Sequence, residues 1–304
     1  MNYKCCRILT ILLLALLLSC TEASGQSFGQ NFDRTIHGEL VLRAFQRSFP
    51  DKISDVAFID GDWTITAGEQ IFFWAEGRLL PKAERENAES FEHHRFYYYP
   101  TRVRPPETLS PECIADIRYR ALPQNRRTDR NISHAFHGVL YGGFTRAEVE
   151  RTLERIVFLG RRVTVHRMIV EPLRRVETEI RRWQGGEAFI ASLESVYGYN
   201  WRQIAGTQRR SFHSWGLAID IQPRRLGGRA IFWQWERARN RDWMLIPLAS
   251  RWNPPAPVIR AFERQGFIWG GKWTFFDNMH FEFRPELFEL RRLLTSANTV
   301  RRRQ

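Results

Sequence analysis

Apolar residues recur at helical spacing in some stretches of the chain and at alternate positions in others. The helical spacing predicts helices at 39–49, 112–120, 145–157, 172–183, 188–197 and 257–265. Alternation between turn residues predicts short strands at 56–59, 63–66, 70–75, 162–166, 217–222, 267–269 and 280–283. In the second half of the chain, helices are followed by strands whose pattern is typical of an antiparallel sheet. The pattern therefore predicts an α+β fold in which helices pack on an antiparallel sheet.

Three local patterns indicate where these elements turn or end. Asp60-Gly61-Asp62 separates two predicted strands and indicates a turn. Thr145 followed three residues later by Glu148 is the capping-box pattern of a helix start. Gly266 follows the helix predicted at 257–265, in the position that favours glycine.

The first 25 residues have the pattern of an export signal. A positively charged start precedes an apolar run at 8–18 that is too short to span a bilayer comfortably. Leu-x-Ser-Cys, ending at Cys20, resembles a bacterial lipoprotein signal, and ordinary cleavage near residues 23–25 is the alternative. We therefore expect a signal peptide at 1–25 and an exported protein of the cell envelope or periplasm. Lipidation of Cys20 would anchor that protein to a membrane.

Cysteine use adds one expectation. If Cys20 is acylated and the two cysteines within the signal are removed, only Cys113 remains. We therefore expect no disulfide framework, and we expect Cys113 to be a small buried hydrophobic residue rather than a nucleophile.

The rest of the chain divides into an irregular first half and a more regular second half. The whole chain has 304 residues, enough for one large or two modest domains. A polar, arginine-rich stretch at 122–130 is the best candidate for a boundary. We expect a smaller N-terminal accessory domain at 26–130, a second domain at 131–298 and a basic tail at 299–304.

The charge of the chain points to an anionic partner. The formal net charge is +13, and only four of the 46 basic residues are lysines. Arginine offers a planar, bidentate fork to carboxylates and phosphates. A cell-wall polymer, lipid headgroups or nucleic acid would each fit, and a generally arginine-rich surface is the plain alternative. No nucleic-acid-binding module is recognisable, and an export signal argues against nucleic acid.

Two motifs carry the candidate chemistry. Residues 211–220 read SFHSWGLAID, and residues 277–281 read DNMHF. Together they supply His213, Asp220 and His280, and two imidazoles with one carboxylate form a zinc ligand set that leaves a position open for water. Strand alternation puts Asp220 and His280 on polar faces. A His-x6-Asp pair alone means little, but the second motif and the adjoining GFIWGGKW make a metal site a specific hypothesis.

Two further carboxylates belong to this hypothesis. Asp277 lies three residues before His280, close enough to reach the same water as a general base. Glu282 shares the strand face of His280 and could accept a hydrogen bond from its ring.

The paired motifs resemble those of the VanY-like zinc peptidases, which include D-alanyl-D-alanine carboxypeptidases and L-alanyl-D-glutamate endopeptidases. The family pattern Ser-x-His-x-x-Gly-x-Ala-x-Asp is met at 211–220, and Gly-Phe-x-Trp-Gly-Gly-x-Trp followed by Asp-x-x-His-Phe is met at 266–281. The resemblance covers about residues 144–290. It implies the Hedgehog/DD-peptidase fold and hydrolysis of peptidoglycan stem peptides with one zinc ion.

The resemblance also implies roles for individual residues. It implies zinc ligation by His213, Asp220 and His280, and a catalytic base at Asp277. It implies an arginine that stabilises the oxyanion or holds a substrate carboxylate, and Arg202 matches that position. Arg209 and Arg210 are rivals for the arginine role. Ser211 would orient the substrate or a ligand.

One departure bears on the substrate. Some relatives carry glutamate as the base, whereas this chain has Asp277, the form found in the endopeptidase-like branch. That difference weakly favours cleavage within the stem peptide over removal of its terminal D-alanine.

Other readings remain. A zinc-containing module that binds wall peptides without cutting them is the main alternative, although such a module need not keep both Asp277 and Arg202. His134 and His137 could form a second metal site or lie in a solvated loop. His166 could be a core histidine or line the substrate cleft. His93 and His94 are expected at the surface.

Overall fold

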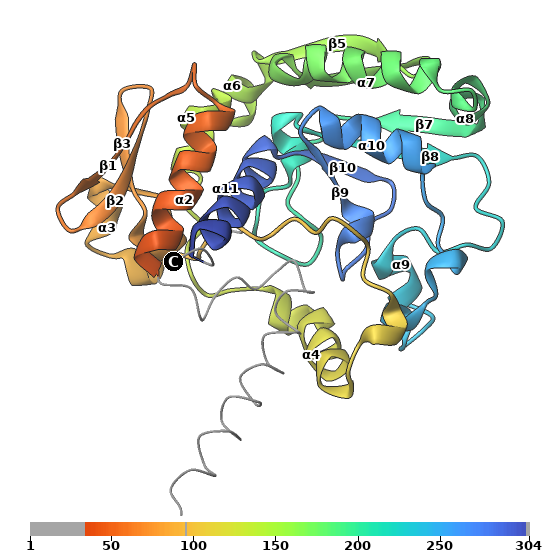
Figure 1. Cartoon of the computed structure of the whole chain (residues 1–304), viewed down its shortest axis with the longest axis horizontal. Helices are drawn as coiled ribbons and strands as arrows, with labels where there is room; N and C mark the ends of the chain where they lie inside the picture. Colours follow the sequence, from red (N-terminus) through yellow and green to blue (C-terminus); the bar gives the residue numbers. More distant parts are fainter. Residues whose placement is uncertain (1–33, 95, 302–304) are drawn as a thin grey trace, which may run out of the picture.

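Two four-stranded antiparallel sheets and a two-stranded hairpin form the framework of the fold (Figure 1). The chain is described by a computed structural model that covers residues 34–94 and 96–301. The predicted signal peptide, with Cys20, lies outside the described residues. The predicted tail does so in part, since residues 299–301 continue the last helix. The architecture is α+β with antiparallel sheets, as the sequence predicts.

The first sheet lies in the N-terminal half and has the strand order β1-β2-β3-β4. Asp60 and Gly61 both adopt positive φ between its first two strands, so the predicted turn is confirmed. Its strands are β1 (Ile53–Ile59), β2 (Asp62–Ala67), β3 (Gln70–Phe73) and β4 (Leu80–Pro81). The helices of this half are α2 (Arg34–Ser48), α3 (Lys82–Arg85) and α4 (Pro111–Ala121).

The second sheet has the order β7-β8-β10-β9 and carries both motifs. Its strands are β7 (Leu193–Tyr197), β8 (Ala218–Pro223), β9 (Phe267–Trp269) and β10 (His280–Phe283). The separate hairpin is β5 (Leu153–Phe158) and β6 (Arg161–His166). The helices of this half are α5 (Ala135–Tyr141), α6 (Arg146–Glu150), α7 (Val170–Arg182), α8 (Gly186–Ser192), α9 (Trp233–Arg237), α10 (Ala256–Arg264) and α11 (Pro285–Arg301).

Two predicted helices are too long, because the residues predicted at their C-terminal ends form β-strands instead. The capping box at Thr145 is present, but the helix that it starts ends at Glu150. Residues 153–158 then pair with 161–166 as an antiparallel hairpin. Likewise, the helix predicted at 188–197 ends at Ser192, and the following residues pair with β8. Short apolar runs fit both the helical and the strand repeat of apolar residues. Pairing with other strands in the folded protein decides which structure forms.

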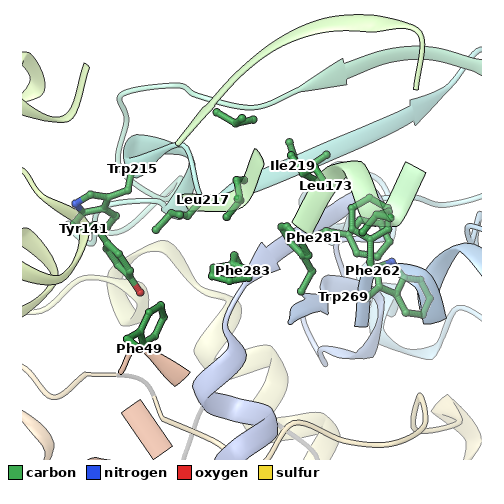
Figure 2. Close-up of a cluster of buried hydrophobic side chains, with 14 of the residues drawn as sticks. Phe49, Tyr141, Leu173, Trp215, Leu217, Ile219, Phe262, Trp269, Phe281 and Phe283 are labelled. Carbon is green, nitrogen blue, oxygen red and sulfur yellow. The ribbon is translucent and has the colours of Figure 1, made fainter. Parts of the chain in front are cut away.

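One buried hydrophobic cluster extends through both halves of the chain. Phe49, just after α2, packs its ring 6.4 Å from Phe283 on β10 and 6.3 Å from Tyr141 at the end of α5. Figure 2 shows these side chains together with Trp215, Leu217 and Phe281 from the second half. Helices α2 and α11 lie side by side in Figure 1, and they share many close residue pairs. The core therefore continues across the boundary predicted near residue 130, and the division into two domains stays a prediction.

Two further observations concern the state of Cys113 and the search for a membrane-spanning helix. Cys113 is buried on α4, as expected, but it is disulfide-bonded, so the expectation of no disulfide is wrong at this residue. No helix among the described residues has the length and apolarity needed to cross a membrane.

The continuous core leads to a stability prediction. Phe49→Ala should lower the free energy of unfolding by about 3–5 kcal/mol, because it removes a ring that packs against both halves. Unfolding in denaturant, followed by circular dichroism and tryptophan fluorescence, should still show one transition. Phe58→Ala, on the exposed face of β1 with 55% of the residue exposed, is the matched control and should cost far less. Two separate transitions, with only the first shifted, would contradict a shared core.

Candidate metal centre

His213 is held by a tight turn that precedes β8. The turn spans Phe212–Trp215, and the hydroxyl of Ser211 accepts a hydrogen bond from the His213 N–H at 3.3 Å. Gly216 ends the turn with φ +66°, and a Cβ there would approach the backbone nitrogen of His166 to 2.7 Å. Glycine is therefore required at this position, and it fixes where the His213 ring lies relative to the strand that follows.

Asp220 and His280 face each other across two antiparallel strands. They are direct partners in the register of β8 and β10, so both side chains project from the same face of the sheet. Atom Nδ1 of His280 lies 2.8 Å from Oδ1 of Asp220 and 3.2 Å from Nε2 of His213. Atom Nε2 of His213 lies 3.2 Å from Oδ2 of Asp220. The three predicted ligands thus converge on one point.

The outward-facing ring nitrogens of both histidines have acceptors of their own. Nδ1–H of His213 donates to the Gly198 carbonyl at 2.5 Å. Nε2–H of His280 donates to Glu282 at 3.2 Å, and Glu282 accepts a further bond from Arg284 at 3.1 Å. These bonds leave a lone pair on the inward nitrogen of each ring, as a metal ion requires. Glu282 therefore lies where the sequence predicts a partner for His280.

The electrostatics of the cluster favour a cation. Burial alone would raise the pKa of Asp220, but the two adjacent histidines hold it well below its usual range. Burial would lower the pKa of His280, yet Asp220, Glu282 and Asp277 raise it to about 10. The centre thus concentrates negative charge around a gap between two imidazole nitrogens. Among the described residues, this is the one group of three side chains arranged to hold a metal ion.

The chemistry of the donors fits zinc. Two neutral imidazoles and one carboxylate match the ligand sets of catalytic zinc sites, which keep a fourth position for water or substrate. An ion at this point would replace the close contacts between nitrogen and oxygen atoms with coordination bonds.

Asp277 lies in the loop just before β10, beside this centre. Its N–H donates to the Gly270 carbonyl at 3.1 Å, and a Cβ on Gly270 would come within 2.6 Å of the Asp277 carbonyl oxygen. Burial, and next the charge of Asp220, raise the pKa of Asp277 to about 7, against the opposing effects of His280 and Arg202. Its Oδ1 atom is buried without a hydrogen-bond partner. An unpaired buried carboxylate oxygen is costly, which suits an atom that works on a substrate or water.

The neighbouring Asn278 was missed by sequence reasoning. This buried side chain donates to the Trp252 carbonyl at 2.8 Å and to the side chain of Asn253 at 2.6 Å. These bonds fix the loop that carries Asp277. Its place inside the DNMHF motif was the only signal in the sequence.

The structure separates the three candidate arginines. All three line the cavity that Asp277 and His280 also line, and the charge of Arg202 acts on the pKa of Asp277. Arg209 is tied to the N-terminal half by an ion pair with Glu92 at 3.4 Å. Arg210 donates to the Phe144 carbonyl and lies over the ring of Trp201 at 4.4 Å. Of the three, Arg202 has the surroundings expected beside a reacting group.

Ser211 also borders the cavity, but it is buried and its oxygen caps the turn of His213. Its position is therefore explained by holding the ligand. A direct contact of its hydroxyl with substrate stays a prediction.

The remaining histidines include one that meets an expectation and others that depart from it. His166 is buried: its Nε2–H donates to the Tyr141 carbonyl and its Nδ1 accepts from the Met168 N–H, both at 3.0 Å, so it is a core residue. His134 and His137 line the cavity, whereas one expectation placed them in a solvated loop. His94, expected at the surface, also lines this cavity.

The bond between Glu282 and His280 can be tested without any substrate. Glu282→Gln keeps the size of the side chain but removes its charge, and it should weaken zinc affinity about 10- to 100-fold. Competition with a chromogenic chelator measures this directly. Glu289→Gln, on α11, is the matched control and should bind zinc like the parent protein, because Glu289 belongs neither to the candidate ligand group nor to the cavity lining. Unchanged affinity in Glu282→Gln would show that this carboxylate does not support the ligand.

Comparison with known proteins gives two partial matches. The family model described as D-alanyl-D-alanine carboxypeptidase matches residues 205–283, a span that contains His213, Asp220, Asp277 and His280. A model described as a domain of unknown function matches residues 41–102. No curated protein and no solved structure matches the chain. The first match supports, at the level of the family, a peptidase whose matched region contains the three candidate metal ligands.

Proposed function

We propose that this protein is an exported, zinc-dependent peptidase that hydrolyses peptidoglycan stem peptides. The observation that carries the proposal is the convergence of His213, Asp220 and His280 beside the buried, unpaired carboxylate of Asp277. The match to a D-alanyl-D-alanine carboxypeptidase model supports the choice of substrate class. The signal pattern at residues 1–25 supports export, and a lipid anchor at Cys20 is part of the same proposal.

Zinc held by these three ligands would polarise the scissile carbonyl and make water a stronger nucleophile near neutral pH. Asp277 accepts a proton from the attacking water at its unpaired Oδ1 atom. It then delivers that proton to the nitrogen of the leaving amine as the amide bond breaks. Burial and the charge of Asp220 raise the pKa of this carboxylate, which suits it to both transfers.

Arg202 stabilises the charge that develops on the carbonyl oxygen. Arg202 lines the cavity together with Asp277, and its Nη1 donates to the Gln203 carbonyl at 3.4 Å. A cation already in place at a developing oxyanion lowers the barrier by several kcal/mol.

Two bonds of the stem peptide are candidates for cleavage. One is the terminal D-Ala-D-Ala bond and the other is the L-Ala-D-Glu bond. The matched family favours the first, while aspartate rather than glutamate at position 277 favours the second. Mass analysis of purified muropeptides after incubation with the protein distinguishes these products. It would also reveal the alternative, a module that binds wall peptides without cutting them, as a set of unchanged masses.

If Asp277 is the base, its replacement should abolish most of the activity and leave metal binding intact. Asp277→Asn should lower kcat by about 100- to 10,000-fold while each chain still binds one zinc ion. Muropeptide digestion and metal analysis on the same sample measure the two quantities. Asp55→Asn, an exposed aspartate on β1, is the control. Normal cleavage by Asp277→Asn would rule out this base.

The role of Arg202 predicts a loss that falls mainly on the chemical step. Arg202→Ala should reduce kcat by about 100- to 1,000-fold, because the donor acts on charge that develops during the reaction. Steady-state kinetics on one peptide substrate provide the measurement, with exposed Arg229→Ala as the control. An effect confined to KM would instead assign Arg202 to ground-state binding.

A further inference from the structure

The cavity beside the metal centre is built from both halves of the chain. It measures about 230 Å³, and Arg202, Asp277 and His280 are among the residues that line it. The N-terminal half contributes His94, Phe96 and Tyr97 to its lining. These three residues lie within the span matched by the domain of unknown function and outside the span matched by the peptidase model. A wall of the peptidase cavity therefore comes from a region with no assigned role.

Hydrogen bonds hold the segment that forms this wall in place. The N–H of His94 donates to the Gly77 carbonyl at 2.8 Å, and the N–H of Glu92 donates to the Asn131 carbonyl at 2.8 Å. Further along, the Tyr97 hydroxyl accepts a bond from the Trp273 ring nitrogen at 2.9 Å. The Trp273 ring in turn lies 5.5 Å from the ring of His280. Tyr97 is therefore connected to the candidate ligand His280 through the side chain of Trp273.

Neutral imidazoles gather in this part of the cavity. The His94 and His137 rings meet edge to face at 4.7 Å, and His137 stacks on Tyr141 at 5.5 Å. Burial lowers the pKa of His94 to about 3 and holds that of His137 well below its usual range. His137 is 92% buried, with 8% of its surface exposed, and its Nε2 has no hydrogen-bond partner. An unsatisfied buried polar atom costs about 1–3 kcal/mol, which a ligand could recover.

A cation without a counter-charge borders the same imidazoles. Arg210 lines the cavity, and its charge acts on the pKa of both His134 and His137. Its Nη1 is buried without a partner, and its other contacts are the Phe144 carbonyl and two tryptophan rings. In the part of the chain that the structure describes, no carboxylate forms an ion pair with Arg210, whereas Arg209 beside it is paired with Glu92.

From this arrangement we propose that His94, His134, His137 and Arg210 form a subsite of the cavity that binds the free α-carboxylate of a γ-linked D-glutamate in the peptide substrate. An unpaired guanidinium supplies charge, and imidazole N–H groups add hydrogen bonds without further charge. The region at 41–102 would then determine specificity by completing this subsite. The inference rests on the proposed peptidase function and deepens it.

Three synthetic peptides test the subsite. The first is the stem pentapeptide L-Ala-γ-D-Glu-L-Lys-D-Ala-D-Ala with a free glutamate carboxylate. In the second that carboxylate is a carboxamide, and in the third only the C-terminus is amidated. Calorimetric titration of zinc-loaded Asp277→Asn protein measures binding without turnover, and cleavage by the parent protein is measured in parallel. We expect the first peptide to bind about 10- to 100-fold more tightly than the second.

His94→Gln and Arg210→Gln, each made in the Asp277→Asn background, should reduce that preference to about threefold or less. His93→Gln is the matched control, because this neighbouring side chain does not line the cavity. Zinc content and thermal unfolding of every variant show whether it is folded. If one of the two variants does not fold, the other still tests the subsite.

The possible failures can be told apart. If the parent protein cleaves the peptides but both variants keep the full preference, the subsite is wrong and the proposed function stands. Discrimination against the third peptide alone would also overturn the subsite, because it would assign the cations to the terminal carboxylate. If no peptide is bound or cleaved, the proposed function fails and the subsite fails with it.

Discussion

The antiparallel register of β8 and β10 is the constraint on which the rest of the site depends. Because Asp220 pairs directly with His280, both side chains leave the same face of the sheet, with their polar atoms 2.8 Å apart. A shift of one residue would turn one of them to the opposite, apolar face. The turn that ends at Gly216 then places His213, the third candidate ligand, beside them. Strand β10 carries both His280 and its hydrogen-bond partner Glu282.

Negative charge at this centre explains several features of the surrounding chain. Asp220, Asp277 and Glu282 are all largely buried, an arrangement that is costly without compensating cations. Arg284 compensates Glu282 directly, and it also pairs with Glu286 at the start of α11. The positive charge of Arg202 lowers the pKa of Asp277 against the effect of burial. A divalent ion between the two imidazoles would supply the largest part of the missing positive charge, so metal binding and the stability of this sheet are expected to be linked.

Sequence reasoning was most successful where local pattern and chemistry agree. Alternation placed Asp220 and His280 on polar strand faces, and motif chemistry brought His213 and Asp277 to the same centre. It failed at 153–158 and 193–197, where apolar runs suit either period and pairing with distant strands decides the outcome. It also missed His94, Asn278 and the Gly198 carbonyl, because their roles depend on which segments the fold brings together. No local pattern indicates that residues 94, 96 and 97 reach a cavity built mainly by residues 202–284.

The central claim is that one zinc ion is bound by His213, Asp220 and His280. Anomalous diffraction at the zinc edge from crystals of the metal-loaded protein tests it most directly. The account predicts one strong peak within about 2.0–2.2 Å of Nε2 of His213, Nδ1 of His280 and a carboxylate oxygen of Asp220. A peak among His94, His134 and His137, or no bound zinc in protein that still cleaves wall peptides, would contradict it.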